Sequence, residues 1–317
     1  MARFLLVHFL GGVATVWGLI TVLFLLFQVL PGDPVMAMID PATASTMPES
    51  VLQERRREFG LHLPRWQQYL TYLTRVAQGD LGRSWETREP VARIIGRRLP
   101  HTIGLATGGM LVAILLGIPT GLIAAAYRNS PLDYAITLFS VVWIASPNFW
   151  LALLILYAFA YRLGWFPIVS TGLEAGFLSM LRQLVLPSVA IGLRTAGLLA
   201  RLTRSSMLEV LGDDFVRTAR AKGLGTRAVL WKHALRNALI PVVTLVGVNL
   251  GYLLGGAAVI EIVFAREGLG WLIIQAIRLR DYPTFQGAML MFALGIVLVN
   301  LVVDLLYGLI DPRIRHV

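Results

Sequence analysis

The chain has 317 residues, of which 56% are hydrophobic and 15% are charged, and its mean hydropathy is +0.70. Soluble domains are about 45–50% apolar and about 25% charged, so this composition argues against a soluble protein and predicts an all-α, polytopic membrane protein. The net charge of +10 fits basic loops at the inner membrane face, and we expect no nucleic acid partner. The chain has no cysteine and no histidine pair with the spacing of a metal motif, so no metal site is expected.

Six apolar segments are long enough to cross a membrane, which takes about 20 residues. They are 9–30, 102–127, 134–161, 184–202, 237–263 and 285–309. The first is too long for the apolar part of a signal peptide and no cleavage pattern follows it, so we expect an uncleaved span. The even number of spans and the basic loops place both termini in the cytoplasm.

This pattern divides the chain into an N-terminal transmembrane helix at 1–30, an external helical segment at 31–101, and a transmembrane domain of five helices at 102–317. The external segment carries ten arginines and eight acids, but the positive-inside rule applies to loops of up to ~60 residues. Residues 48–59 and 65–77 have helical patterns, and Gly79-Asp80-Leu81-Gly82 interrupts the second. We expect a small periplasmic helical subdomain that lies on the membrane face.

A basic loop at 205–236 connects the fourth and fifth spans. Asp213 or Asp214 suits a helix N-terminus, and Gly223 supplies a left-handed stop. Thr226 is expected to cap a second helix that leads through Pro241, as a kink, into the fifth span. The sequence therefore predicts a cytoplasmic helical hairpin that is fixed at both ends to membrane spans.

This hairpin has two other interpretations, a solvated basic loop without a partner and a helix-turn-helix that reads DNA. The small side chains of Thr218, Ala219 and Ala221 suit close docking better than solvation. Attachment to the bilayer at both ends argues against a DNA-reading role.

Polar residues inside spans are candidates for a translocation pathway, because their burial in lipid is costly. They are Asn148, Arg194, Asn249, Glu261 and Asn300. For each, the alternative is a helix–helix hydrogen bond or an interfacial position. The alternative is favoured for Asn300, and Glu261 lies near the outer end of its span, where water is expected to reach it. Gly247, Gly251, Gly255 and Gly256 permit close helix approach, so we expect the fifth span to face a partner and the pathway.

Two rival classes are less favoured. An ion-coupled secondary transporter needs carboxylates near the midplane, whereas Asp304 lies near the inner end of its span. An intramembrane enzyme needs a zinc motif or a histidine deep within a span, and neither is present in the sequence.

Residues 217–223 read Arg-Thr-Ala-Arg-Ala-Lys-Gly, and residues 235–241 read Leu-Arg-Asn-Ala-Leu-Ile-Pro. Together they resemble the coupling motif of ATP-binding-cassette importer permeases. Arg217, Thr218, His233 and Arg236 depart from its general Glu-Ala-Ala form toward the variant of the peptide and nickel branch. Segments at 30–34, 79–82, 98–100, 147–149, 280–283 and 309–313 agree with that branch in family order. The resemblance is to the first of the two permease subunits of dipeptide, oligopeptide, glutathione and nickel importers.

The resemblance implies a heterodimer with a second, homologous permease, which together form a pathway for peptides or a similar small solute. It also implies two ATPase subunits and an extracytoplasmic solute-binding protein, in the cytoplasmic (inner) membrane of a bacterium or archaeon. Nickel chelates and glutathione remain alternative cargoes.

The same resemblance identifies the residues that would contact an ATPase groove: Phe215, Arg217, Thr218, Ala219, Ala221, Lys222 and Gly223. From the polar and glycine patterns within the spans, the candidates for the pathway and the permease interface are Asn148, Arg194, Asn249, Gly251, Gly255 and Glu261. The chain has no phosphate-binding loop motif, so it is not expected to be an enzyme. ATP and magnesium would bind the partner ATPases, and this chain itself would hold no cofactor.

Overall fold

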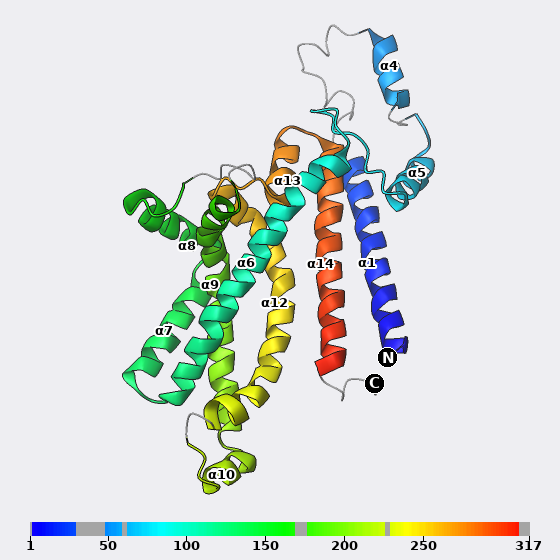
Figure 1. Cartoon of the computed structure of the whole chain (residues 1–317). Coiled ribbons are helices and arrows are strands. Elements are labelled where there is room, and N and C mark those ends of the chain that lie inside the picture. Colours follow the sequence, from blue (N-terminus) through cyan, green and yellow to red (C-terminus); the bar gives the residue numbers. More distant parts are fainter. Residues whose placement is uncertain (1, 30–47, 59–61, 169–175, 226–228, 311–317) are drawn as a thin grey trace.

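The computed structural model describes residues 2–29, 48–58, 62–168, 176–225 and 229–310. In these residues the regular structure is helical, apart from one isolated β-bridge between Arg83 and Pro90. The long helices are α1 (Ala2–Val29), α6 (Val91–Ala126), α9 (Phe177–Val210), α12 (Leu235–Val263) and α14 (Tyr282–Ile310). Helix α10 (Asp214–Ala221) lies at one end of this bundle, and α13 (Leu269–Arg278) lies at the other (Figure 1).

The external segment contains two of its expected helices. They are α4 (Glu49–Glu58) and α5 (Arg65–Ala77), so the helical patterns at 48–59 and 65–77 are confirmed. Helix α5 lies beside the end of α1 that is remote from α10 (Figure 1). Amphipathic spacing was a sufficient signal here because each pattern is local.

Four helices in the described residues are long and apolar enough to cross a membrane, namely α6, α9, α12 and α14. They contain the second, fourth, fifth and sixth expected spans. The second begins earlier than expected, at Val91 rather than at residue 102. The first expected span corresponds to α1, whose described apolar stretch is Leu10–Leu26. The number of six spans therefore stays a prediction.

The third expected span, 134–161, is wrong as one continuous helix. Helix α7 (Pro131–Ala145) is followed by α8 (Asn148–Ile155) and the π-helix η1 (Leu156–Arg162), and the two parts meet at 110°. Ser146 precedes a proline and takes an extended backbone with ψ 135°, because proline disfavours the helical region for the residue before it. Pro147 also has no N–H to continue the helical hydrogen bonds.

Glycines bring the central helices into backbone contact. A Cβ at Gly117 of α6 would lie 2.7 Å from the carbonyl oxygen of Ala196 in α9, and one at Gly192 of α9 would lie 2.5 Å from that of Gly109. A Cβ at Gly197 would lie 2.7 Å from the carbonyl oxygen of Ser140 in α7. Real Cβ atoms do not approach so closely, so α9 is interlocked with both α6 and α7.

The main apolar core lies among α6, α8, α9 and α12, where Leu105, Leu199 and Ile260 are fully buried. A smaller cluster joins α1 to α14 through Ile20 and Leu290. Helices α1 and α14 consequently lie side by side at one edge of the bundle (Figure 1).

Candidate coupling helix and pathway

Helix α10 is a short, well-terminated helix between α9 and α12. The backbone carbonyl of Asp213 accepts from the amides of Val216 at 3.1 Å and Arg217 at 3.3 Å, so Asp213 occupies the N-cap position. At the other end Gly223 has φ +78°, and the amide of Leu224 donates to the carbonyl of Ala219 at 3.3 Å. This is the Schellman arrangement, so the helix stop expected at Gly223 is confirmed.

One side of α10 packs against the chain itself. Val216 is fully buried and Ala219 is 7% exposed, and both contact Val229 in the following segment. Val210 and Leu211, at the end of α9, complete this cluster. The helix is therefore braced against the bundle on its apolar side.

The opposite side of α10 is open to solvent and small at its centre. Thr218 and Ala221 are exposed there, with Arg217 and Lys222 beside them and Phe215 41% exposed at the edge. The Thr218 hydroxyl donates to the carbonyl of Asp214 at 3.0 Å, which keeps that side chain against its own helix.

Ala219 is a correction to the predicted docking face, because it lies on the buried side of α10. In the sequence, Ala219 lies one helical turn from both Phe215 and Gly223, and this spacing does not show which side of α10 faces the bundle. Contact with Val229 does decide it, and that contact depends on how the chain returns after the turn.

The return to the bundle differs from the regular helix that the sequence predicted. Thr226, the expected cap, lies outside the described residues. From Val229 to Ala234 the chain forms a π-helix, η3, and α12 follows at Leu235. Pro241 lies inside α12, which runs through it without ending.

An ion pair between a buried carboxylate and a half-buried guanidinium lies at the same end of the bundle and was not predicted. Arg204 of α9 donates through Nε to Asp133 Oδ1 at 2.6 Å and through Nη2 to Asp133 Oδ2 at 2.8 Å. Asp133 is 1% exposed and also accepts the amide of Asn129 at 2.9 Å. Such a two-bond pair fixes the α6–α7 turn to α9. Arg204 is therefore a structural residue, which lies in α9 just before the basic loop at 205–236.

The pathway candidates Asn148, Arg194 and Asn249 lie on three different helices, α8, α9 and α12. Arg194 is exposed on α9. Asn249 is 7% exposed, and its Nδ2 donates to the carbonyl of Leu245 in its own helix at 2.9 Å. Asn148 begins α8 at the 110° bend, and its buried Oδ1 has no hydrogen-bond partner in the part of the chain that the structure describes. A Cβ at Gly256 would lie 3.6 Å from Asn148 Nδ2, so this bend rests on α12.

The glycines of α12 face different neighbours. Gly251 is buried, and a Cβ there would lie 3.1 Å from Asn300 Oδ1 in α14. Its close contact is therefore within the chain. Gly255 is exposed, with open space where a Cβ would stand. Of the two, Gly255 is the one on an open face.

Glu261 is fully buried, so the expectation that water reaches it is wrong. Thr102 of α6 donates to its Oε1 at 2.6 Å, and the amide of Trp271 donates to its Oε2 at 3.0 Å. The Thr102 hydroxyl also accepts the amide of Leu269 at 2.8 Å. These bonds place a carboxylate at the N-terminus of α13, where the helix dipole favours negative charge.

Arg266 lies close to this carboxylate and is 2% exposed. Burial lowers the pKa of Arg266, and the charge of Glu261 opposes that effect. Arg98, on the same side of the bundle, pairs with Glu267 and lies over the ring of Trp271, 5.2 Å from its centroid. Sequence reasoning missed the Thr102–Glu261 and Arg98–Glu267 contacts because their partners are 159 and 169 residues apart.

A second carboxylate joins the loop between α5 and α6 to the start of α14. Asp281 is 4% exposed and accepts from Ser84 Oγ at 2.5 Å, from the amide of Trp85 at 3.0 Å and from Thr284 Oγ1 at 2.7 Å. The ring of Trp85 packs edge-on against Tyr282. A Cβ at Gly82 would lie 3.9 Å from Cβ of Pro283, so the motif segments 79–82 and 280–283 meet at this junction.

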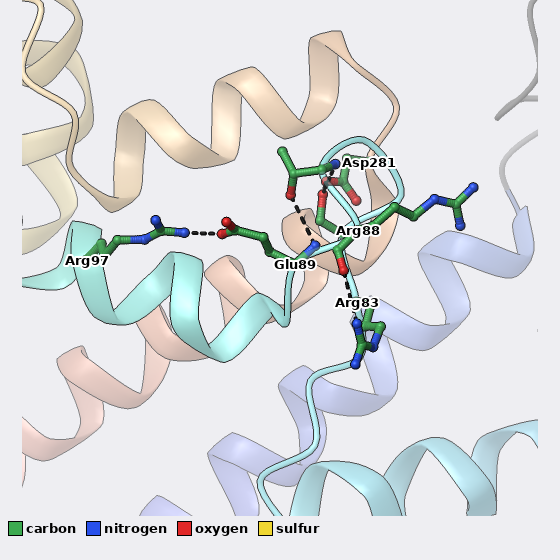
Figure 2. A network of polar contacts seen from close by, with 7 residues as sticks. Arg83, Arg88, Glu89, Arg97 and Asp281 are labelled. Carbon is green, nitrogen blue, oxygen red and sulfur yellow. Dashed lines mark hydrogen bonds and ion pairs between the residues drawn. The ribbon is translucent and has the colours of Figure 1, made fainter.

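The rest of this junction stabilises the loop itself (Figure 2). Arg83 Nη1 donates to the carbonyl of Arg88 at 3.2 Å, and Glu89 forms an ion pair with Arg97 of α6. The Arg88 guanidinium points away from the network (Figure 2). In the described residues no cluster of His, Cys, Asp or Glu side chains has the arrangement of a metal site.

Comparison with known proteins assigns this architecture. Residues 117–316 match the family of binding-protein-dependent transport system inner membrane components, and residues 1–106 match the N-terminal family of the same transport system membrane components. In the search of solved structures, a chain of the MetNI methionine ABC transporter in inward-facing conformations matches with a TM-score of 0.57 and 16% identity. The match covers 69% of this chain and 96% of that chain. It supports the fold.

The sequence relatives are full-length matches. A protein of Brucella suis biovar 1 named as a peptide permease is 42% identical over 319 residues, covering 99% of each chain. The glutathione transport system permease protein GsiC of Escherichia coli O6:H1 is 39% identical over 316 residues, covering 100% of each. The chain therefore belongs to the binding-protein-dependent transport system inner membrane component family, as a multi-pass permease subunit of an ABC importer of the peptide and glutathione branch.

Proposed function

We propose that this permease pairs with a second, related permease, and that two ATPase subunits bind on the side of α10. ATP hydrolysis on those subunits drives uptake, and an extracytoplasmic binding protein delivers the cargo. The observation that carries this proposal is α10, a helix with its apolar side braced by Val216 and Val229 and its small, polar side exposed. A rigid helix transmits a displacement that a flexible loop would absorb.

The side of α10 is proposed to be cytoplasmic, as are both termini. Helix α1 begins and α14 ends toward the same end of the bundle as α10 (Figure 1). The exposed Arg217 and Lys222 fit the excess of basic residues found in cytoplasmic loops.

The proposed cargo is a short peptide, with glutathione as the second candidate because of the relative named as a glutathione permease. Arg194 is the charged pathway candidate that is exposed, whereas Glu261 is buried, and a cation within a span suits a cargo that carries a carboxylate. Uptake of labelled dipeptide and of labelled glutathione by reconstituted vesicles, each in competition with the other, separates these cargoes.

Gly223 provides the test of the coupling role. Its φ of +78° favours glycine, yet a Cβ there meets no atom within 4 Å, so valine would act only through backbone strain. A left-handed residue other than glycine costs about 1–2 kcal/mol, enough to unwind the end of a helix of this length. We expect Gly223→Val to reduce uptake per ATP hydrolysed and to weaken binding of the ATPases.

Two variants control that experiment. Gly225→Val adds the same side chain in open space two residues later, where the backbone is not left-handed, and should preserve coupling. Gly223→Asn should restore part of it, because asparagine tolerates the left-handed region. Normal uptake per ATP in Gly223→Val would overturn the coupling role of α10.

A further inference from the structure

Helix α5 carries an exposed apolar stripe that its packing within the chain does not use. On one side, the Tyr69 hydroxyl is 2.8 Å from Thr21 Oγ1 of α1, and the rings of Tyr69 and Tyr72 pack on Phe24. Tyr72 also joins the cluster between α1 and α14, and burial raises its pKa to about 12. This side of α5 is therefore fixed to the edge of the bundle.

The exposed stripe lies next to that fixed side. Trp66 is 61% exposed, Leu70 is 50% exposed, and Ala77 is exposed in line with them. Residues spaced by four and seven lie along one face of a helix. On the far side from α1, Thr71 and Arg75 are exposed, so α5 has separate apolar and polar exposed faces.

The position of α5 along α1 identifies what meets the apolar stripe. Helix α1 has 28 residues and is roughly 42 Å long, against about 30 Å for the hydrocarbon core of a bilayer. Phe24 and Thr21 lie roughly 8 and 12 Å from the end of α1 at Val29. In a centred α1, about 6 Å would project at each end, so α5 crosses α1 just inside the boundary between headgroups and hydrocarbon.

The neighbouring surface of α1 is also apolar and exposed. Trp17, Val22, Leu25 and Leu26 are each more than half exposed. The stripe of α5 lies at the depth where tryptophan is enriched in membrane proteins, because the tryptophan ring is amphipathic. We infer that α5 is an interfacial helix whose Trp66 and Leu70 insert into the lipid leaflet on the side remote from α10, and that it sets the depth of α1.

The inference can be tested with spin labels, since the chain has no cysteine and each introduced cysteine is unique within it. Single variants Trp66→Cys, Leu70→Cys and Ala77→Cys label the apolar stripe, and the last leaves both anchoring side chains in place. Thr71→Cys and Arg75→Cys label the polar face as matched controls. The labelled full chain, assembled with its partner subunits, is placed in lipid nanodiscs.

Oxygen concentrates in hydrocarbon, whereas a water-soluble nickel chelate is excluded from it. We expect the ratio of relaxation by oxygen to relaxation by the chelate to be severalfold higher at 66, 70 and 77 than at 71 and 75. Equal ratios on the two faces would overturn the inference. It would also be overturned if the chelate reached the stripe freely until a binding protein was added, because a protein partner would then cover it.

Discussion

Thr102 connects α6, α12 and α13 at the end of the bundle remote from α10, and its replacement by valine tests that connection. Its hydroxyl donates to Glu261 Oε1 and accepts the amide of Leu269, at 2.6 and 2.8 Å. Valine has a similar shape and makes neither bond. A hydrogen bond to a charged group contributes about 1.5–3 kcal/mol, and a buried unpaired amide costs about 1–3 kcal/mol. We expect Thr102→Val to lower the free energy of unfolding by about 2.5–6 kcal/mol.

The eight tryptophans of the chain allow unfolding of the purified protein to be followed by intrinsic fluorescence. In a large domain 1 kcal/mol corresponds to about 2–4 °C, so the midpoint should fall by about 10 °C. Thr107→Val, on the same helix, is the matched control. Thr107 is exposed and its hydroxyl donates to carbonyls of its own helix, so its midpoint should barely change. Equal midpoints for the two variants would refute the capping role of Thr102.

Three further outcomes follow from the packing. Gly117→Ala should destabilise the chain by about 1–3 kcal/mol in the same unfolding assay, whereas Gly96→Ala, on the same helix but in open space, should not. Asp133→Asn should cost about 1–3 kcal/mol, because Arg204, whose side chain is 29% exposed, loses its charged partner. Burial raises the pKa of Tyr72 to about 12 in the folded chain, against about 10 in the unfolded chain. The free energy of unfolding should therefore fall as the pH rises from about 10 to about 12, because only the unfolded chain loses this proton in that range. That fall should be smaller in Tyr72→Phe, as measured by unfolding midpoints across that pH range.

Elements whose causes are local could be predicted from the sequence. Helix α5 has the predicted bounds, because its apolar spacing lies within thirteen residues. The stop at Gly223 followed from one residue that favours a left-handed backbone. The long apolar helices followed from length and hydropathy for the same reason. None of these features depends on a partner elsewhere in the chain.

The bend between α7 and α8 had a signal that was not decisive. Pro147 interrupts the third span, but Pro100, Pro119 and Pro241 lie inside continuous helices. A proline therefore permits a bend without requiring one. Tertiary contacts decide the outcome here, since α8 packs on both α9 and α12 once the chain has turned.

The polar partners could not be predicted, because sequence spacing carries no information about them. Asp133 and Arg204 are 71 residues apart, and Thr102 and Glu261 are 159 apart. Glu261 illustrates the error that follows. A carboxylate near the end of a span suggested contact with water, whereas the fold uses it as the cap of α13. Its surroundings come from α6 and α13, which the hydropathy pattern does not place next to each other.

These contacts also determine how a displacement of α10 would enter the bundle. The end of α9 packs on α10 through Val210, and glycines interlock α9 with α6 and α7. The bidentate Asp133–Arg204 pair fixes α7 to α9 a second time. Closely packed elements move together rather than deform, so α6, α7 and α9 should move as one body. The bend at Pro147 lies at the border of that body, where no helical N–H bond resists a change of angle. Asn148 lies at this bend, against α12. A movement of α6, α7 and α9 as one body would therefore change the surroundings of Asn148 more directly than those of the other pathway candidates.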